Sequence, residues 1–158
     1  MPSIFVSIAD QSLSLNSHKE DITYPVSTAK LGPGEKKNSY CTPRGKHIIR
    51  AKIGTNASRG EIFKSRRATG EVFSKNRHND KNSDWILTRI LWLSGIEKGK
   101  NRLGNVDTMQ RYIYIHGTPE EGFIGQPASH GCIRMKNTDV IELYDIIDEG
   151  TPIYILKR

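Results

Sequence analysis

Short runs in which polar and apolar residues alternate recur along this chain, and they restrict its fold more than any other feature. SIFVSIAD and QSLSLNS alternate in this way over residues 3–17, on either side of a break at Asp10 and Gln11. Successive side chains of a strand point to opposite faces of its sheet, so this period of two predicts a β-hairpin. RYIYIHG, residues 111–117, repeats the pattern and ends at a glycine. We therefore expect a sheet of short strands.

Further strands are expected where β-branched and aromatic residues gather between turn signals. They cover YPVST at residues 24–28, residues 46–52, DWILTRILWLSG at residues 84–95 and TPIYIL at residues 151–156. Residues 84–95 fit a helix or a strand by periodicity, but their composition and the closing Ser94-Gly95 favour a strand. Before residues 46–52, Pro43 and Gly45 predict a tight turn, because proline presets φ and glycine tolerates positive φ.

Only the region near the C-terminus predicts a helix. Its apolar residues recur at helical spacing: Val140, Ile141, Leu143, Tyr144, Ile146 and Ile147. Asn137 or Thr138 is expected to cap this helix, and Gly150 is expected to end it. A length of 158 residues favours a single domain over residues 1–158. The predicted fold class is therefore mostly β, with one helix near the C-terminus.

Residues 56–84 depart from this regular pattern, because they show neither a strand period nor a helix period. Their basic residues outnumber their acidic ones and comprise Arg59, Lys64, Arg66, Arg67, Lys75, Arg77 and Lys81. A long irregular segment inside a compact domain is either a functional lid or a solvated loop. We expect residues 56–84 to form a basic lid or a surface excursion.

The net charge of +7 and the pI of about 9.5 suit an anionic partner, although a solvated basic surface has the same composition. No homeodomain, zinc-finger or RNP-type signature is present, so we expect no nucleic-acid partner. No apolar run approaches the roughly 20 residues of a membrane span, which predicts no transmembrane segment. The first residues, MPSIFVSIADQSL, lack a basic n-region and do not resemble a secretory signal. That observation favours the cytoplasm.

Cys132 is the residue that most strongly suggests chemistry. It lies in ASHGCIRMKN, residues 128–137, among histidine, serine, glycine and arginine. A cysteine attacks as the thiolate, which requires a base or a positive charge nearby. His116 and His130 are the candidate bases. His116 is favoured, because a histidine at the end of a neighbouring strand has more freedom to reach the sulfur.

The neighbours of Cys132 supply the other parts of an acyl-transfer site. The N–H groups of Gly131 and Cys132 would stabilise an oxyanion, and Arg134 would hold a substrate carboxylate through its planar guanidinium. Ser129 would bond a histidine or the substrate, or serve only as a turn residue. Two alternatives stay open from the residues alone. Cys132 is a buried structural thiol, or it binds zinc together with the two histidines.

IHGT, a spacer and then SHGCIRM resemble the active-site signature of the YkuD-type L,D-transpeptidases. VSTAK at residues 26–30 and TPRG at residues 42–45 resemble further landmarks of that family. The resemblance implies a β-sandwich-like catalytic domain that acts on peptidoglycan stem peptides without a metal or another cofactor. It also implies that Cys132 is the nucleophile, that His116 is the general acid/base and that the Gly117 carbonyl orients His116. By the same resemblance, His130, Ser129 and Gly131 are pocket and oxyanion-hole residues, and Arg134 is the substrate contact.

The implied reaction cleaves the diaminopimelate–D-alanine bond of a tetrapeptide donor and passes the acyl group to an amine, giving a 3→3 cross-link or an attached protein. Family members are also acylated by carbapenems. Water as the acceptor would make the chain an L,D-carboxypeptidase of wall recycling. A catalytically silent peptidoglycan-binding module is the alternative from another class. A caspase-type peptidase fits poorly, because there the glycine follows the cysteine.

Two expectations depend on the substrate class, and a third concerns the second cysteine. Peptidoglycan as substrate favours the cell envelope or periplasm, against the cytoplasm that the N-terminal residues favour. The basic segment at residues 59–81 would contact an anionic wall surface. Two cysteines are too few for a disulfide framework, so Cys41 is expected to be a bystander thiol, or to form an inhibitory disulfide with Cys132 on oxidation.

Overall fold

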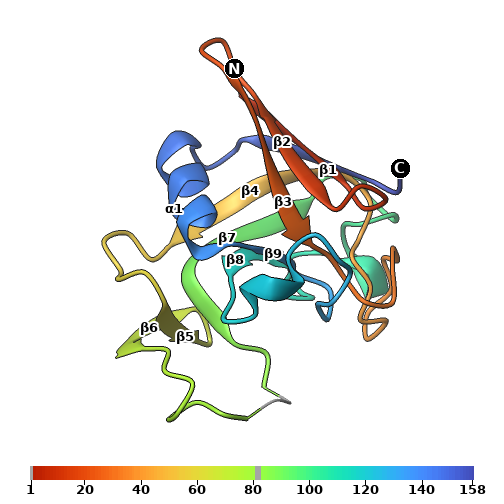
Figure 1. The fold of residues 1–158 in the computed structure, drawn as a ribbon. Coiled ribbons are helices and arrows are strands. Elements are labelled where there is room, and N and C mark those ends of the chain that lie inside the picture. Colours follow the sequence, from red (N-terminus) through yellow and green to blue (C-terminus); the bar gives the residue numbers. More distant parts are fainter. Residues whose placement is uncertain (1, 81–82) are drawn as a thin grey trace.

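The structure is a computed structural model that describes residues 2–80 and 83–158 (Figure 1). The described residues contain ten strands: β1 (Ser3–Ser7), β2 (Ser12–Asn16), β3 (Asp21–Ser27), β4 (Gly45–Ile53), β5 (Glu61–Lys64), β6 (Arg67–Val72), β7 (Ile86–Gly95), β8 (Tyr114–Gly117), β9 (Ile133–Met135) and β10 (Pro152–Leu156). They also contain one α-helix, α1 (Asn137–Ile146), and the short 3-10 turns Gly104–Val106 and Glu121–Phe123. The expected mostly-β fold with one helix near the C-terminus is confirmed.

The strands form one sheet in the order β4-β10-β1-β2-β3-β9-β8-β7-β5-β6. A further pairing joins β4 to β7, so the sheet closes on itself and the β5–β6 hairpin extends from its β7 side. Two neighbouring pairs are parallel, β1 with β10 and β8 with β9, and the other pairs are antiparallel. The β8–β9 pair matters for function, because it brings two distant parts of the chain together.

The β1–β2 hairpin confirms the alternation that predicted it. Its register runs from Ser3 opposite Asn16 to Ser7 opposite Ser12. Ile4 and Val6 of β1 and Leu13 and Leu15 of β2 are fully buried in the main core, whereas the intervening positions, which include Phe5, are partly or wholly exposed. A shift of one residue would turn every one of these apolar side chains to solvent, so the burial fixes the register.

Helix α1 begins and ends at other residues than the sequence predicts. Its N-cap is Lys136, and neither Asn137 nor Thr138 caps it. The side chain of Asn137 is used elsewhere, because its Nδ2 donates to the Thr118 carbonyl at 2.9 Å and its Oδ1 accepts from the Thr88 hydroxyl at 2.6 Å. Instead, the Glu121 carboxylate accepts the Asn137 N–H at 2.8 Å. The helix stops at Ile146, before Gly150, because Ile147 is extended and buried.

Residues 56–84 are more regular than expected. Residues 61–72 form the β5–β6 hairpin, so the prediction of an irregular segment is wrong there. The hairpin pairs with the start of β7 and lies far from the β1–β2 hairpin (Figure 1). Beyond it, the rings of Phe73, His78 and Trp85 contact one another with centroids 5.3 to 5.4 Å apart. Residues 81 and 82 of the expected segment lie outside the described residues.

Strand β7 is the longest strand, and it confirms the choice of strand over helix for residues 84–95. It pairs with β4, β5 and β8. Helix α1 contacts β7 and β8 and adds Val140, Leu143 and Tyr144 to the main core. Within the described part of the chain, no helix has the length and apolar character needed to span a membrane.

Candidate active site

Cys132 immediately precedes β9, beside β8. The register of this parallel pair sets Ile115 opposite Ile133 and His116 opposite Arg134. The Cys132 Sγ accepts a hydrogen bond from the Tyr114 N–H at 3.3 Å, and its S–H donates to the Tyr112 carbonyl at 3.4 Å. Backbone from the β8 side therefore holds the sulfur in place, and the residue is only 8% exposed.

His116 shares a face of the sheet with Cys132. Ile115 and Ile133 point into the main core, so the residues that alternate with them point to the other face. On that face Tyr114 lies beside Cys132, and His116 lies one pair further along, beside Arg134. A second hydrophobic cluster, which includes Tyr114, Cys132 and Phe63 of β5, covers this face. The parallel pairing thus brings together two residues that are sixteen positions apart in the sequence.

The imidazole of His116 is fully buried and held in one orientation. Its Nδ1–H donates to the Gly117 carbonyl at 2.6 Å, because a carbonyl oxygen can only accept. Nε2 therefore carries the lone pair, and it has no hydrogen-bond partner among the described residues. Burial lowers the pKa of His116, although Asp84 and the Gly117 carbonyl oppose that shift. The ring is therefore neutral at neutral pH and able to accept a proton.

The thiol of Cys132 is also uncharged at neutral pH. Burial, followed by the nearby Asp84 carboxylate, raises the pKa of Cys132 to about 12. The Tyr114 N–H and the cations Arg134 and Arg111 act in the opposite direction and lower this pKa. A nucleophile in this state requires a base at the moment of attack.

Hydrogen bonds fix the loop before Cys132. The Ser129 hydroxyl donates to the Cys132 carbonyl at 2.5 Å, and it accepts the Gly131 N–H at 3.2 Å. Gly131 has a φ of +129°, and a Cβ there would lie 3.2 Å from the Cys41 carbonyl oxygen. The Gly131 N–H can therefore stabilise an oxyanion only by giving up its bond to Ser129.

Arg134 does not reach the open space at Cys132. Its side chain is 7% exposed, and its Nη2 donates to the Asp84 carboxylate at 3.0 Å. The segment that leads into β7 covers it, since Asp84 lies two residues before that strand. This arrangement does not support the expected grip of Arg134 on a substrate carboxylate. Sequence reasoning missed Asp84, because no signal in the sequence relates it to a residue fifty positions later.

A cavity of about 290 Å³ opens at Cys132. The residues that line it are Tyr40, Ser65, Arg66, Asp84, Ile86, Arg111, Tyr112, Ile113, Tyr114, His130 and Cys132. His130 is exposed and lies edge-on to Tyr40, with ring centroids 6.4 Å apart. The two histidines therefore occupy different places, with His116 buried within the sheet and His130 lining the opening.

Backbone strain is concentrated around this cavity. Nine described residues other than glycine have positive φ, and four of them line the cavity: Tyr40, Ser65, Arg66 and Tyr112. Positive φ is uncommon for residues with a Cβ, and such conformations gather where the surrounding structure enforces them at functional sites. The strain indicates a functional site independently of any sequence motif.

Arg111 is a further site residue that sequence reasoning missed. Its two terminal nitrogens donate to four acceptors in one loop: the carbonyls of Gly34 and Glu35, the Ser39 hydroxyl and the Cys41 carbonyl, at 2.7 to 3.3 Å. Desolvation lowers the pKa of this arginine. Arg111 therefore ties the loop at residues 34–41 to the cavity wall and brings a positive charge toward Cys132.

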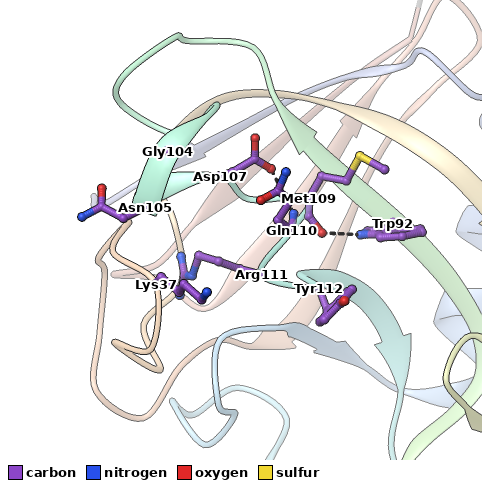
Figure 2. Close-up of a pocket in the computed structure, with 9 residues that line it drawn as sticks. All are labelled: Lys37, Trp92, Gly104, Asn105, Asp107, Met109, Gln110, Arg111 and Tyr112. Carbon is purple, nitrogen blue, oxygen red and sulfur yellow. Dashed lines mark hydrogen bonds between the residues drawn. The ribbon is translucent and has the colours of Figure 1, made fainter.

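A second cavity, of about 460 Å³, adjoins the first and shares Arg111 and Tyr112 with it. Figure 2 shows its walls, where Lys37 and Arg111 lie on one side and the Trp92 indole donates to the Met109 carbonyl on the other. Across residues 2–80 and 83–158, no group of three His, Cys, Asp or Glu side chains is arranged to hold a metal ion.

A family model for the YkuD L,D-transpeptidase catalytic domain matches residues 2–155. The chain belongs to this family. The resemblance carried by IHGT and SHGCIRM is thereby confirmed. This chain is 54% identical over 46 residues to a putative L,D-transpeptidase YkuD of Bacillus subtilis, a match that covers 29% of this chain and 28% of that protein.

A second curated protein and a solved structure are also similar to this chain. A probable L,D-transpeptidase ErfK/SrfK of Salmonella typhimurium is 42% identical over 48 residues, which is 30% of this chain and 16% of that protein. L,D-transpeptidase 3 of Mycobacterium tuberculosis, solved with a faropenem-derived adduct, superposes with a TM-score of 0.60 at 18% identity. That match covers 99% of this chain and 61% of the mycobacterial one, and it shows a shared fold. The chain thus spans only part of the length of the relatives it matches.

Proposed function

We propose that this YkuD-family chain transfers an acyl group of a peptidoglycan stem peptide through a thioester on Cys132. One observation carries the proposal: Nε2 of buried His116 lies on the same sheet face as the Cys132 thiol and has no hydrogen-bond partner in the part of the chain that the structure describes. The names of the relatives support the substrate class, since each is called an L,D-transpeptidase. The positive charges of Arg66 and Arg111 at the cavity agree with a substrate that carries free carboxylates.

Acylation begins with both groups neutral. His116 Nε2 takes the proton from Cys132 as the sulfur attacks the carbonyl carbon at the L-centre of diaminopimelate. A C–S bond forms, and the carbonyl oxygen becomes an oxyanion that backbone N–H donors near Cys132 stabilise. The intermediate collapses, the C–N bond to D-alanine breaks, and His116 returns its proton to the leaving amine.

Deacylation repeats these steps with a new nucleophile. An acceptor amine attacks the thioester carbonyl, His116 takes the proton of that amine, and the C–S bond breaks. The proton then returns to the Cys132 sulfur. An amine of a second stem peptide would give a 3→3 cross-link and an amine of a protein would give attachment, whereas water would give hydrolysis.

The burial of both reacting groups has a consequence for the order of events. An ion pair between a thiolate and an imidazolium is disfavoured in the resting protein, because burial raises one pKa and lowers the other. Proton transfer should therefore accompany attack on the carbonyl. His116 would therefore act as a general base during the attack, and it would not be an imidazolium paired with a Cys132 thiolate in the resting protein.

Mass analysis of products tests the proposal. The protein is incubated with a purified disaccharide-tetrapeptide, in parallel with Cys132→Ala and with Cys41→Ser as the matched thiol control. We expect a cross-linked dimer and free D-alanine from the wild type and from Cys41→Ser only. Tripeptide and D-alanine without dimer would assign L,D-carboxypeptidase activity instead. No Cys132-dependent product would leave a silent binding module and refute the proposal.

A further inference from the structure

Arg66 stands apart from the other arginines near Cys132. Arg134 is buried and paired with Asp84. The terminal N–H groups of Arg111 donate hydrogen bonds to the loop at residues 34–41. Arg66 makes one side-chain hydrogen bond within residues 2–80 and 83–158, from Nη1 to the Tyr114 hydroxyl at 3.0 Å. A guanidinium has five N–H donors, so most of those on Arg66 remain open.

The backbone places Arg66 at the cavity in an unusual way. Ser65 and Arg66 join β5 to β6 as a two-residue turn, with φ values of +48° and +63°. Turns of this kind favour asparagine and glycine, because both central residues have positive φ. Two residues with a Cβ are strained there, so the turn gives up local stability to present an arginine at this point.

Aromatic rings hold the guanidinium of Arg66 without consuming its donors. The guanidinium carbon lies 5.1 Å from the centroid of the Trp92 ring and 4.7 Å from that of Tyr112. Cation–π contacts use the faces of a guanidinium, whereas a carboxylate binds along its edge through two parallel N–H···O bonds. The side chain is therefore preorganised with donors still available.

The charge balance of the cavity points to an anion. Of its charged lining residues, Asp84 is neutralised by Arg134, which leaves Arg66 and Arg111 without an ion-pair partner among the described residues, beside a neutral thiol. From this arrangement we infer that Arg66 is a specificity residue whose guanidinium binds a carboxylate of the donor stem peptide. The inference rests on the proposed function, and it transfers to Arg66 the role that the sequence suggested for Arg134.

A binding experiment with a matched ligand series tests this assignment. The protein carries Cys132→Ala, so that ligands bind without reacting, and the probe is the tetrapeptide L-Ala-γ-D-Glu-diaminopimelate-D-Ala. Calorimetry compares Arg66→Gln with Arg50→Gln, which removes the same charge from an exposed position on β4. We expect Arg66→Gln to raise Kd about tenfold or more, as for loss of a charge-assisted hydrogen bond, and Arg50→Gln to leave it unchanged.

Three tetrapeptides, each amidated at one carboxylate (glutamate, diaminopimelate or terminal D-alanine), complete the cycle. One of them should bind wild type and Arg66→Gln with equal Kd, because its missing carboxylate is the partner of Arg66. Equal losses for all three ligands, or an unchanged Kd in Arg66→Gln, would overturn the inference. Arg66→Lys separates recognition from a structural role, because it keeps the charge but loses the planar fork. Because an ammonium also pairs with a carboxylate, lysine should recover part of the lost affinity. Losses that follow the thermal stability of the variants would also overturn the inference.

The failure of this inference differs from a failure of the proposed function. With Cys132 intact, Arg66→Gln should still form the acyl-enzyme at high tetrapeptide concentration, detected as a mass increase on Cys132. Absence of that acyl-enzyme in the wild type would refute the proposed function, whatever the calorimetry shows.

Discussion

The guanidinium of Arg134 donates to the carboxylate of Asp84 across 3.0 Å, and this ion pair acts electrostatically on both groups that we propose to react, Cys132 and His116. Asp84 acts on the pKa of His116 and of Cys132, raising both, while Arg134 lowers both. The pair also connects β9 to the segment that enters β7. It therefore influences reactivity and stability together.

Asp84→Asn should change these two properties in opposite directions. Without the carboxylate the pKa of Cys132 falls, so the thiolate fraction at pH 9 rises and alkylation by iodoacetamide should be several-fold faster. The buried Arg134 loses its charged partner, so the free energy of unfolding in urea should fall by about 1–3 kcal/mol. Asp145→Asn, at an exposed position of α1, is the control. Slower alkylation in Asp84→Asn would contradict the assigned electrostatics.

The reactivity of the free thiol should depend steeply on pH. In a Cys41→Ser background Cys132 is the one thiol that can be alkylated. Its alkylation rate should rise about tenfold per pH unit without a plateau below pH 10. The reason is the pKa of about 12 that burial imposes. A plateau of the alkylation rate between pH 6 and 8 would instead indicate a thiolate–imidazolium pair in the resting protein.

The same shift predicts a loss of stability at alkaline pH. The unfolded thiol titrates near pH 8.5, whereas the folded thiol keeps its proton to about pH 12. Between these values the unfolded state binds fewer protons, so the free energy of unfolding should decrease as pH rises, by about 1.4 kcal/mol per unit. Cys132→Ala should show a shallower decrease over the same range. Identical slopes in urea titrations of the two proteins would disprove this linkage.

Gly117→Ala should disable the site more than it weakens the fold. A Cβ at Gly117 would lie 2.9 Å from the Leu87 carbonyl oxygen and 3.0 Å from the Thr88 hydroxyl, so the backbone must shift. That shift moves the carbonyl that orients His116. We expect the rate of Cys132 acylation by a carbapenem, followed by intact mass, to fall about 100-fold. Stability should fall by about 1–3 kcal/mol.

Gly122→Ala is the matched control for this variant, because nothing lies within 4 Å of its added Cβ. Wild-type acylation in Gly117→Ala, together with reduced stability, would mean that the Gly117 carbonyl does not position the imidazole.

Arg111→Leu should loosen the loop at residues 34–41. Four hydrogen bonds from one guanidinium are lost, and the loop amides that depend on this conformation should exchange faster. The amides of Gly34 and Lys37, which bond the Thr42 and Asn105 carbonyls, are suitable reporters. We expect at least tenfold faster hydrogen exchange there, with no change in exposed Arg102→Leu. Unchanged hydrogen exchange at both amides would show that the loop keeps its conformation without Arg111.

The strands and the motif around Cys132 were accessible from the sequence because they depend on local patterns. Alternation in residues 3–17 predicted the β1–β2 hairpin, and its alternate apolar residues Ile4, Val6, Leu13 and Leu15 are buried as expected. The β5–β6 hairpin was not predicted, because its register shift and its positive-φ turn at Ser65 and Arg66 disturb the period of two. The helix cap was misassigned, because tertiary hydrogen bonds withdraw the Asn137 side chain from the helix end.

The sequence by itself determined the fold class, and it proposed Cys132 as the nucleophile and His116 as its base. Those conclusions follow from side-chain chemistry and from residues close together in the chain. Only the tertiary structure decided which cation faces the cavity, because burial and pairing depend on segments far apart in sequence. Arg134, two residues from Cys132, is covered and neutralised by Asp84, while Arg66 arrives at the cavity from the tip of a distant hairpin.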